Sequence, residues 1–166
     1  SSTSRGLGDV YKRQEEVCAI ISLGSNKDTD DAVKAAKNSF ESWWGTSKEK
    51  KIELLNNLLE IYMRRSSEMA EAISKEMGAP KDWSINQQSQ SGEDHIKTFI
   101  NNYKKFTFEN YLNEDEGNYI TYEPIGVCAL ITPWNWPINQ IALKVLPALA
   151  CLLYTSPSPQ DVEESR

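Results

Sequence analysis

The sequence lacks any run of about 18 apolar residues, the length that a membrane-spanning helix requires. Its first residues do not pair a basic region with an apolar one, so we do not expect a secretory signal among them. Basic residues are also in deficit, because 18 Lys and Arg stand against 24 Asp and Glu for a net charge of -6. That balance argues against the electropositive surface that nucleic acids need. We therefore expect a cytoplasmic protein that binds neither membranes nor nucleic acid.

Cysteine is scarce and widely spaced. The three cysteines are Cys18, Cys128 and Cys151, an odd number without the spacing of a disulfide framework or a zinc site. We expect reduced thiols and no bound metal. Cys18 and Cys128 each lie in an apolar stretch without a neighbouring base, which predicts inert packing and not catalysis.

The two ends of the chain are related to each other at the level of DNA. A coding sequence for residues 151–161, with one base changed in the codon of Gln160, has a reverse complement that encodes residues 4–13 and begins the codon of Gln14. This inverted tag resembles a transposon-type sequencing adapter, and the alternative is a natural disordered tail rich in Ser and Pro. We predict adapter-like, non-native tails at residues 1–14 and 151–166. The remaining segment, residues 15–150, then has neither an initiating Met nor a finished last helix and is expected to be a fragment.

Apolar periodicity predicts a series of helices in the first two thirds of the chain. Thr29 is the expected cap of the first helix, and Thr46 with Glu49 fits a capping box for the second. Gly78, with Pro80 just beyond it, marks the end of the third helix. The fourth helix is expected to expose its polar first half. The predicted helices cover residues 29–44, 47–64, 66–77 and 82–106.

Strand patterns are short and lie toward the two ends. Residues 17–23 and 119–123 read as strands, and residues 127–131 are apolar enough for a buried strand. Pro137 then begins a helix over residues 137–150. Helices followed by a strand, a turn and a helix indicate an α/β protein that is truncated early.

Asn135 lies on the turn between the last predicted strand and the last helix, flanked by Pro133 and Pro137. A stiff turn at the carboxyl end of a strand is where α/β folds place ligands. The Asn amide donates two hydrogen bonds without carrying a charge, which suits an oxyanion that forms during a reaction. On spacing alone, a helix-capping role for Asn135 is the stronger alternative.

The stretch around this turn contains EPIGVC at 123–128, ITPWNWP at 131–137, INQ at 138–140 and KVLPALA at 144–150. Together with residues 30–36, 40–43 and 75–80, these motifs resemble the aldehyde dehydrogenase superfamily. The resemblance implies the N-terminal helical part of that fold, leading into the first strand, turn and helix of a Rossmann-like cofactor domain. It also implies oxidation of an aldehyde to an acid with NAD or NADP through a cysteine thiohemiacetal, in a homodimer or homotetramer.

The same resemblance assigns roles to residues of the turn and the last helix. It makes Asn135 the donor that stabilises the thiohemiacetal oxygen. It places beside the nicotinamide end of the cofactor the backbone of Ile131, Thr132, Pro133 and Trp134. It also implies that the aldehyde entrance is lined by Trp136, Asn139, Gln140 and Leu143. Because Asn139 and Gln140 are polar, we expect an entrance that is not purely apolar.

Other family residues have no counterpart in this chain. The nucleophilic cysteine and the general-base glutamate lie downstream of Ala150 in the family, so the chain is expected to be inactive alone. His95, the sole histidine, is expected to be solvated. Lys144 matches a lysine common in the family, with packing and an electrostatic role as open alternatives.

Two other functions remain open on the sequence. The first is the acylating semialdehyde branch of the same fold, in which deacylation uses a different acceptor. The second is a helical interaction module without catalysis, which the amphipathic helices favour. Such a module would not need the turn of residues 133–137.

Overall fold

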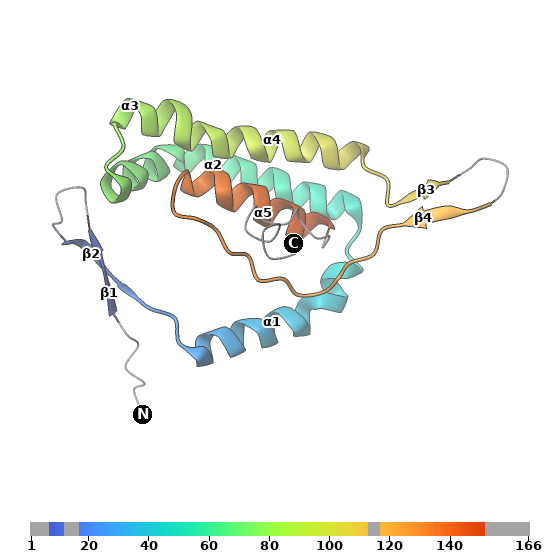
Figure 1. Ribbon diagram of the computed structural model, residues 1–166. Coiled ribbons are helices and arrows are strands. Elements are labelled where there is room, and N and C mark those ends of the chain that lie inside the picture. Colours follow the sequence, from blue (N-terminus) through green and yellow to red (C-terminus); the bar gives the residue numbers. More distant parts are fainter. Residues whose placement is uncertain (1–6, 12–16, 113–116, 152–166) are drawn as a thin grey trace, which may run out of the picture.

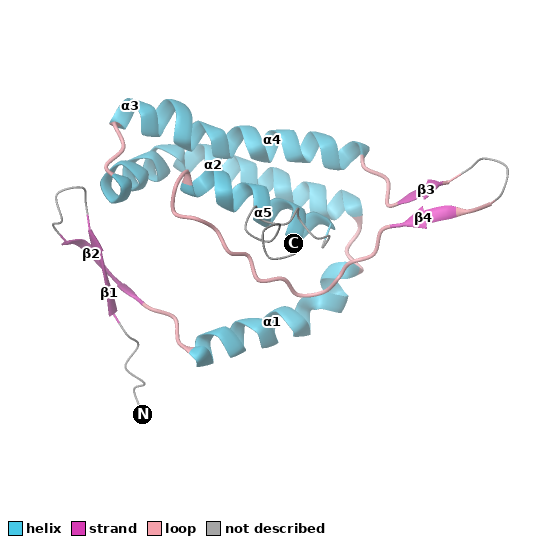
Figure 2. Ribbon diagram, in the orientation of Figure 1, coloured by secondary structure: helices cyan, strands magenta, loops and turns pink. Residues whose placement is uncertain are grey.

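The computed structural model describes residues 7–11, 17–112 and 117–151, and these form a helical body with two small hairpins (Figures 1 and 2). Each hairpin is a two-stranded antiparallel sheet, one of β1 and β2 and the other of β3 and β4. The elements in chain order are β1 (Leu7–Tyr11), β2 (Val17–Ser22), α1 (Asn26–Trp44), α2 (Lys48–Met77), α3 (Lys81–Trp83), the π-helical segment η1 (Ser84–Ser89), α4 (Gln90–Lys105), β3 (Glu109–Tyr111), β4 (Tyr119–Thr121) and α5 (Pro137–Cys151).

The first helix confirms the prediction except at its start. α1 begins three residues before the predicted Thr29, because Ser25 accepts a hydrogen bond from the Asp28 backbone N–H and the Asp28 carboxylate accepts one from the Ser25 N–H at 2.9 Å. This reciprocal pair satisfies two backbone donors that the first turn of a helix leaves unpaired. Thr29 therefore lies inside the helix and is not its cap.

The second and third predicted helices are one continuous helix of 30 residues, so the predicted boundary near residue 65 is wrong. Ser66 does not cap a new helix, because its hydroxyl donates back to the Met63 carbonyl at 3.1 Å. Ser47, and not Thr46, caps the N-terminus by accepting from the Lys50 N–H. Gly78 ends α2 in the left-handed region at φ 69°, as its position predicts.

The fourth predicted helix corresponds to α3, η1 and α4, which follow one another without a break from Lys81 to Lys105. The expectation that its first half is exposed is wrong in part. Ser84, Gln88 and Ser89 are buried against α2, where the Ser89 hydroxyl donates to the Ser66 carbonyl at 2.8 Å. Burial of Ser89 is tolerated because this backbone acceptor of α2 lies within reach of its hydroxyl. Oγ of Ser84 and Oε1 of Gln88 are buried without a hydrogen-bond partner among the described residues.

The core lies where α2, α4 and α5 pack together. It consists of Leu55, Ile96, Ile100, Tyr103, Ala142, Leu146 and Ala150. In Figure 1, α2 runs against the direction of α4, and α5 lies beside α4 and runs with it. The Tyr103 hydroxyl donates to the Ala150 carbonyl at 3.1 Å, and the Trp43 indole N–H donates to the Leu149 carbonyl at 2.7 Å. These two bonds hold the end of α5 in place.

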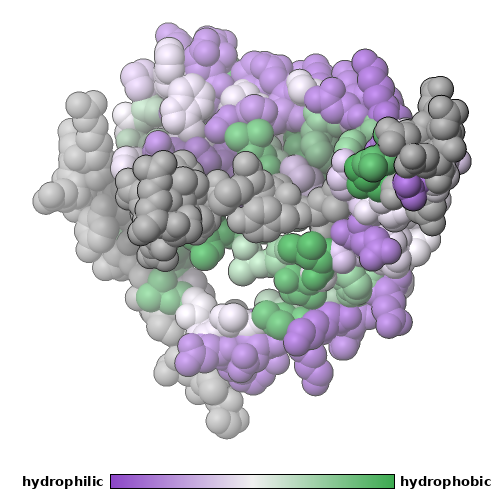
Figure 3. Space-filling view, turned by 45° about the vertical axis from the view of Figure 1, so that its right-hand side comes forward, coloured by the Kyte–Doolittle hydropathy of each residue, from purple (hydrophilic) through white to green (hydrophobic). Residues whose placement is uncertain are grey.

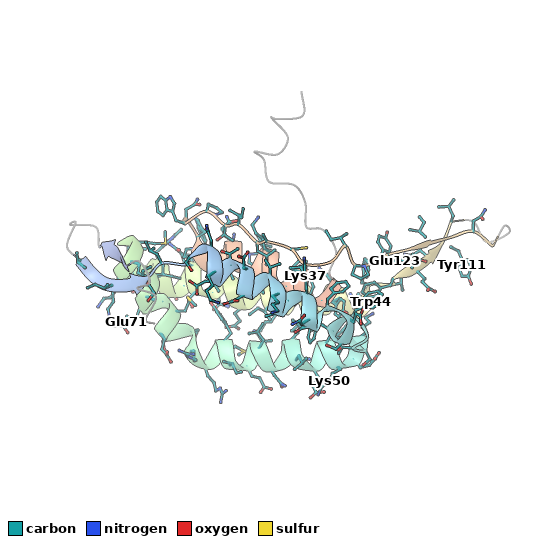
Figure 4. The ribbon with its side chains drawn as sticks, turned by 90° about the horizontal axis from the view of Figure 1, so that it is seen from below. Lys37, Trp44, Lys50, Glu71, Tyr111 and Glu123 are labelled. Atoms are coloured by element: carbon teal, nitrogen blue, oxygen red, sulfur yellow. The ribbon has the colours of Figure 1, made fainter. Side chains whose placement is uncertain are left out.

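The strand predictions fare differently. β2 covers 17–22 as expected and pairs with β1, which lies in the predicted adapter-like tail. β4 covers the first three residues of the predicted strand at 119–123 and pairs with β3 in a hairpin that projects from the helices, with Tyr111 near its end (Figure 4). The buried strand predicted at 127–131 is wrong: this segment is extended and exposed, and it pairs with no strand of the described residues. A strand needs a neighbour for its backbone groups, and the described part of the chain supplies none there.

α1 stands apart from the packed helices. Its Val33 and Trp44 side chains are exposed, and Figure 3 shows hydrophobic residues around an opening between α1, at the bottom of the view, and the helices above it. No helix within the described ranges is long and apolar enough to cross a membrane.

Candidate functional site

The turn before α5 is built from an extended segment and two unusual backbone positions. Residues 122–133 run without regular structure from β4 across the molecule to the start of α5 (Figure 1). Gly126 has φ 113° and Trp136 has φ 53°, the one positive φ at a non-glycine residue in the described part of the chain. A tryptophan in the left-handed region is strained. This strain lies directly beside Asn135, and Pro137 follows it as the first residue of α5.

Asn135 is exposed, and its side chain makes no hydrogen bond to another described residue. The first backbone bond of α5 runs from the Gln140 N–H to the carbonyl of Trp136 at 3.1 Å. Trp136 therefore occupies the position that a capping residue would take, and Asn135 precedes it. The capping alternative receives no support from this geometry, and the Asn135 amide is left with both donors available.

Residues 131–134 are exposed, and their backbone groups have no hydrogen-bond partner among the described residues. The Ile131 and Trp134 side chains are 84% and 78% exposed, and no backbone hydrogen bond joins residues 131–134 to another described residue. Peptide groups in this condition must be satisfied by water or by a binding partner. The segment therefore offers unpaired donors and acceptors of the kind that a planar amide ligand could use.

Asn139, Gln140 and Leu143 share one face of α5, as their helical spacing predicts, and Trp136 directly precedes the helix. Two side chains from the preceding helical segment meet this face. Trp83 contacts Trp136 edge to face, with ring centroids 6.1 Å apart, and His95 approaches Asn139, with Nε2 and Oδ1 2.5 Å apart.

Neither Trp83 nor His95 was assigned to the site from the sequence. The expectation that His95 is solvated is wrong, because the ring is half-buried and hydrogen-bonded. Nothing in the local sequence pairs residue 95 with residue 139, since only the packing of α4 on α5 brings them together.

Gly92 allows this close packing. A Cβ at position 92 would lie 2.5 Å from the Tyr62 hydroxyl and 2.7 Å from Cγ1 of Ile138. The Tyr62 hydroxyl is fixed in turn, because it donates to the Ser89 carbonyl at 2.6 Å. Burial raises the pKa of Tyr62, the bond to Ser89 opposes that rise, and the charge of Glu93 adds to it. Tyr62 is therefore held as a neutral hydrogen-bond donor beside the start of α5.

The remaining candidates contribute no chemistry of their own. Cys128 was expected to be packed, but it is exposed. Its thiol contacts the Gly126 carbonyl at 3.6 Å. The side chains of Cys18 and Cys151 lie outside the described residues. Lys144 is half-buried and makes no ion pair with a described residue, and the described ranges hold no cluster of three or more potential metal ligands.

The comparisons with known proteins agree with this arrangement. Residues 1–160 match the aldehyde dehydrogenase family, and the chain belongs to that family. A 3-succinoylsemialdehyde-pyridine dehydrogenase of Pseudomonas sp is 41% identical over 147 residues, which cover 87% of this chain and 30% of the relative. A putative aldehyde dehydrogenase of Staphylococcus haemolyticus is 37% identical over 151 residues, covering 90% of this chain and 31% of the relative.

Solved structures show the same fold. An aldehyde dehydrogenase of Bartonella henselae superposes with a TM-score of 0.86 at 46% identity, covering 90% of this chain and 32% of that one. A mutant aldehyde dehydrogenase C of Pseudomonas syringae, in complex with NAD+ and octanal, gives 0.83 at 39% identity, covering 90% and 30%. The chain thus spans about a third of the length of these relatives. The α/β class expected from the sequence is that of the family, and this chain contributes its mostly helical N-terminal part. The adapter origin of the two tails stays a prediction.

Proposed function

We propose that the full-length protein containing this chain oxidises an aldehyde to a carboxylic acid with NAD or NADP, through a thiohemiacetal on a cysteine. The observation that carries the proposal is Asn135, an exposed amide on a strained turn at the start of α5, whose two donors have no partner among the described residues. The exposed Cys128 has no base among its contacts, so the nucleophile and the general base belong to other parts of the full-length protein. We also propose that this protein is a cytoplasmic homodimer or homotetramer.

In this proposal Asn135 donates hydrogen bonds to the oxygen that becomes negatively charged when the thiolate adds to the aldehyde. A neutral donor fixed before the reaction stabilises that charge without having to reorganise. The stiffness of the turn between Pro133 and Pro137 keeps the amide in place.

Residues 131–134 would hold the nicotinamide end of NAD or NADP, which would supply the acceptor for the hydride of the thiohemiacetal carbon. The unpaired backbone groups of Ile131, Thr132, Pro133 and Trp134 fit the nicotinamide carboxamide, which needs both donors and acceptors. Exposure of the Ile131 and Trp134 side chains leaves room beside this backbone.

The aldehyde enters along the face of α5 that carries Trp136, Asn139, Gln140 and Leu143. Relatives differ in the aldehydes that their names record, a semialdehyde bearing a pyridine in one and octanal in another. Both are aldehydes, which supports the substrate class. The mixture of apolar and amide side chains on this face fits an aldehyde with both apolar and polar parts.

The test is the oxidation assay on the full-length protein. We expect aldehyde-dependent formation of reduced nicotinamide nucleotide, with the free carboxylic acid as product in the absence of coenzyme A. A product that forms only when coenzyme A is supplied would favour the acylating branch. No nucleotide reduction with any aldehyde would contradict the proposal.

A further inference from the structure

His95 and Asn139 join two helices at the entrance face. His95 lies on α4 between the buried residues Gly92 and Ile96, and Asn139 lies in the first turn of α5. Both side chains are half-buried, and Nε2 of His95 lies 2.5 Å from Oδ1 of Asn139. The contact is therefore a hydrogen bond shielded from most of the solvent.

The chemistry of the two groups fixes the direction of this bond. The amide oxygen of Asn139 can only accept, so Nε2 of His95 carries the proton and donates it. This hydrogen bond to Oδ1 fixes the orientation of the Asn139 amide group. Its NH2 group has no partner among the described residues and keeps two donors available.

Both apolar and polar side chains lie close to Asn139 along the chain. Trp136 lies three residues before it, Gln140 follows it, Leu143 lies one helical turn after it, and Trp83 packs on Trp136. A polar donor beside apolar side chains discriminates between substrates, because a substrate that covers the donor without accepting its hydrogen bond leaves it unsatisfied. An incoming molecule with an acceptor at this point avoids that cost.

The charges near the pair favour a neutral acceptor. Glu93 and Asp94 precede His95 on α4; Glu93 is paired with Lys97, and Asp94 accepts from the Gln90 side chain at 3.1 Å. On α4, the charged groups next to His95 therefore leave no excess positive charge. A carbonyl oxygen is therefore better suited to the donor than a carboxylate.

We propose that His95 is a positioning residue that orients Asn139 toward the entrance, and that Asn139 selects aldehydes bearing a second, uncharged carbonyl group over plain alkyl aldehydes. The proposal rests on the proposed function, since it names the substrate class of the same site. His95 acts only through Asn139.

The experiment compares 4-oxopentanal with pentanal in the full-length protein. We expect kcat/KM for the keto-aldehyde to exceed that for the alkyl aldehyde by about 3- to 10-fold, the range that one neutral hydrogen bond supplies. The difference should arise in KM, because the second carbonyl lies away from the reacting carbon. Asn139→Leu should bring the ratio to about 1.

The variants of His95 separate positioning from mere packing. His95→Leu should bring the ratio close to that of Asn139→Leu, whereas His95→Gln, whose amide N–H can take the place of Nε2–H, should keep most of the selectivity. Thr98→Ala, an exposed change on the same helix, is the control and should keep the full ratio. A melting temperature for each variant identifies any loss of folding.

A wild-type ratio at or below 1, or a ratio that His95→Leu leaves unchanged, would overturn the proposal while leaving aldehyde oxidation intact. If the wild type oxidises neither these two aldehydes nor any other aldehyde, the proposed function fails. The hydrogen bond between His95 and Asn139 can then still be tested on the imidazole of His95. Its ¹⁵N resonances, identified by their loss in His95→Gln, should show a protonated Nε2 and should shift in Asn139→Leu. The opposite tautomer, or no shift, would overturn the positioning role.

Discussion

Gly92 is the residue on which the spacing of α4 and α5 depends. A methyl group there would meet the Tyr62 hydroxyl and Ile138 at distances of 2.5 and 2.7 Å, and the Tyr62 hydroxyl is held by its hydrogen bond to the Ser89 carbonyl. Gly92→Ala in the full-length protein should therefore lower the free energy of unfolding by about 1 kcal/mol or more, the overpacking cost outweighing the better helix propensity of Ala. Denaturant unfolding measures the change.

Gly45→Ala is the matched control for that variant. Gly45 has φ -68°, and its added Cβ would lie at an ordinary 3.6 Å from the Glu41 carbonyl. We expect it to be neutral or slightly stabilising. Equal effects of the two substitutions would show that Gly92 does not set the helix spacing.

At the same scale, the sequence indicated some site residues and missed others. Asn135 and the face of α5 follow from the turn and from helical spacing, which are local properties. His95 and Trp83 could not be found, because their partners lie 44 and 53 positions away, and only the packed helices define the contacts. The sequence also predicted that Cys128 is packed. That prediction depended on a buried strand at 127–131, which does not form.

Among the elements, α2 ends at a C-terminal cap formed by one residue, Gly78. Gly78 adopts φ 69° and its N–H donates to the Ser74 carbonyl at 3.1 Å, closing the last turn before Pro80. Gly78→Ala places a Cβ in the left-handed region and should cost about 1 kcal/mol of stability. The melting temperature of the full-length protein measures it.

Gly24→Ala serves as the comparison, since Gly24 has no atom within 4 Å of an added Cβ and no left-handed backbone. It should leave the melting temperature unchanged. A Gly78→Ala variant as stable as Gly24→Ala would contradict the left-handed cap.

Element boundaries were predictable where a local group sets them and not elsewhere. Pro137 and Gly78 mark their helix ends in the structure as in the sequence. The join of residues 47–64 to 66–77 was missed because Ser66 resembles a cap, while the buried stripe of Leu55, Ala70 and Ile73 runs through the join. The strand at 127–131 was misassigned because apolar composition does not supply a pairing partner.

For the whole molecule, the described chain leaves much apolar surface open. Ile131 and Trp134 are largely exposed, Leu143 and Leu149 are partly so, and α1 packs little against the other helices. A 166-residue chain produced alone should therefore bind hydrophobic dyes and associate. It should also show no aldehyde-dependent nucleotide reduction, because its described cysteine has no base. Measurable turnover by this product would contradict the expectation that catalysis needs other parts of the full-length protein.

The central claim is that Asn135 stabilises an oxyanion, and its two substitutions in the full-length protein test it most directly. Asn135→Ala should lower kcat by about 10²- to 10³-fold with the cofactor Kd nearly unchanged, because the donor acts in the transition state. Asn135→Asp should be at least as harmful, since it places a carboxylate where negative charge develops. Asn101→Ala, at an exposed asparagine of α4, should keep full activity. A helix cap would be served equally well by Asp, so an Asn135→Asp variant with wild-type kcat would contradict the account.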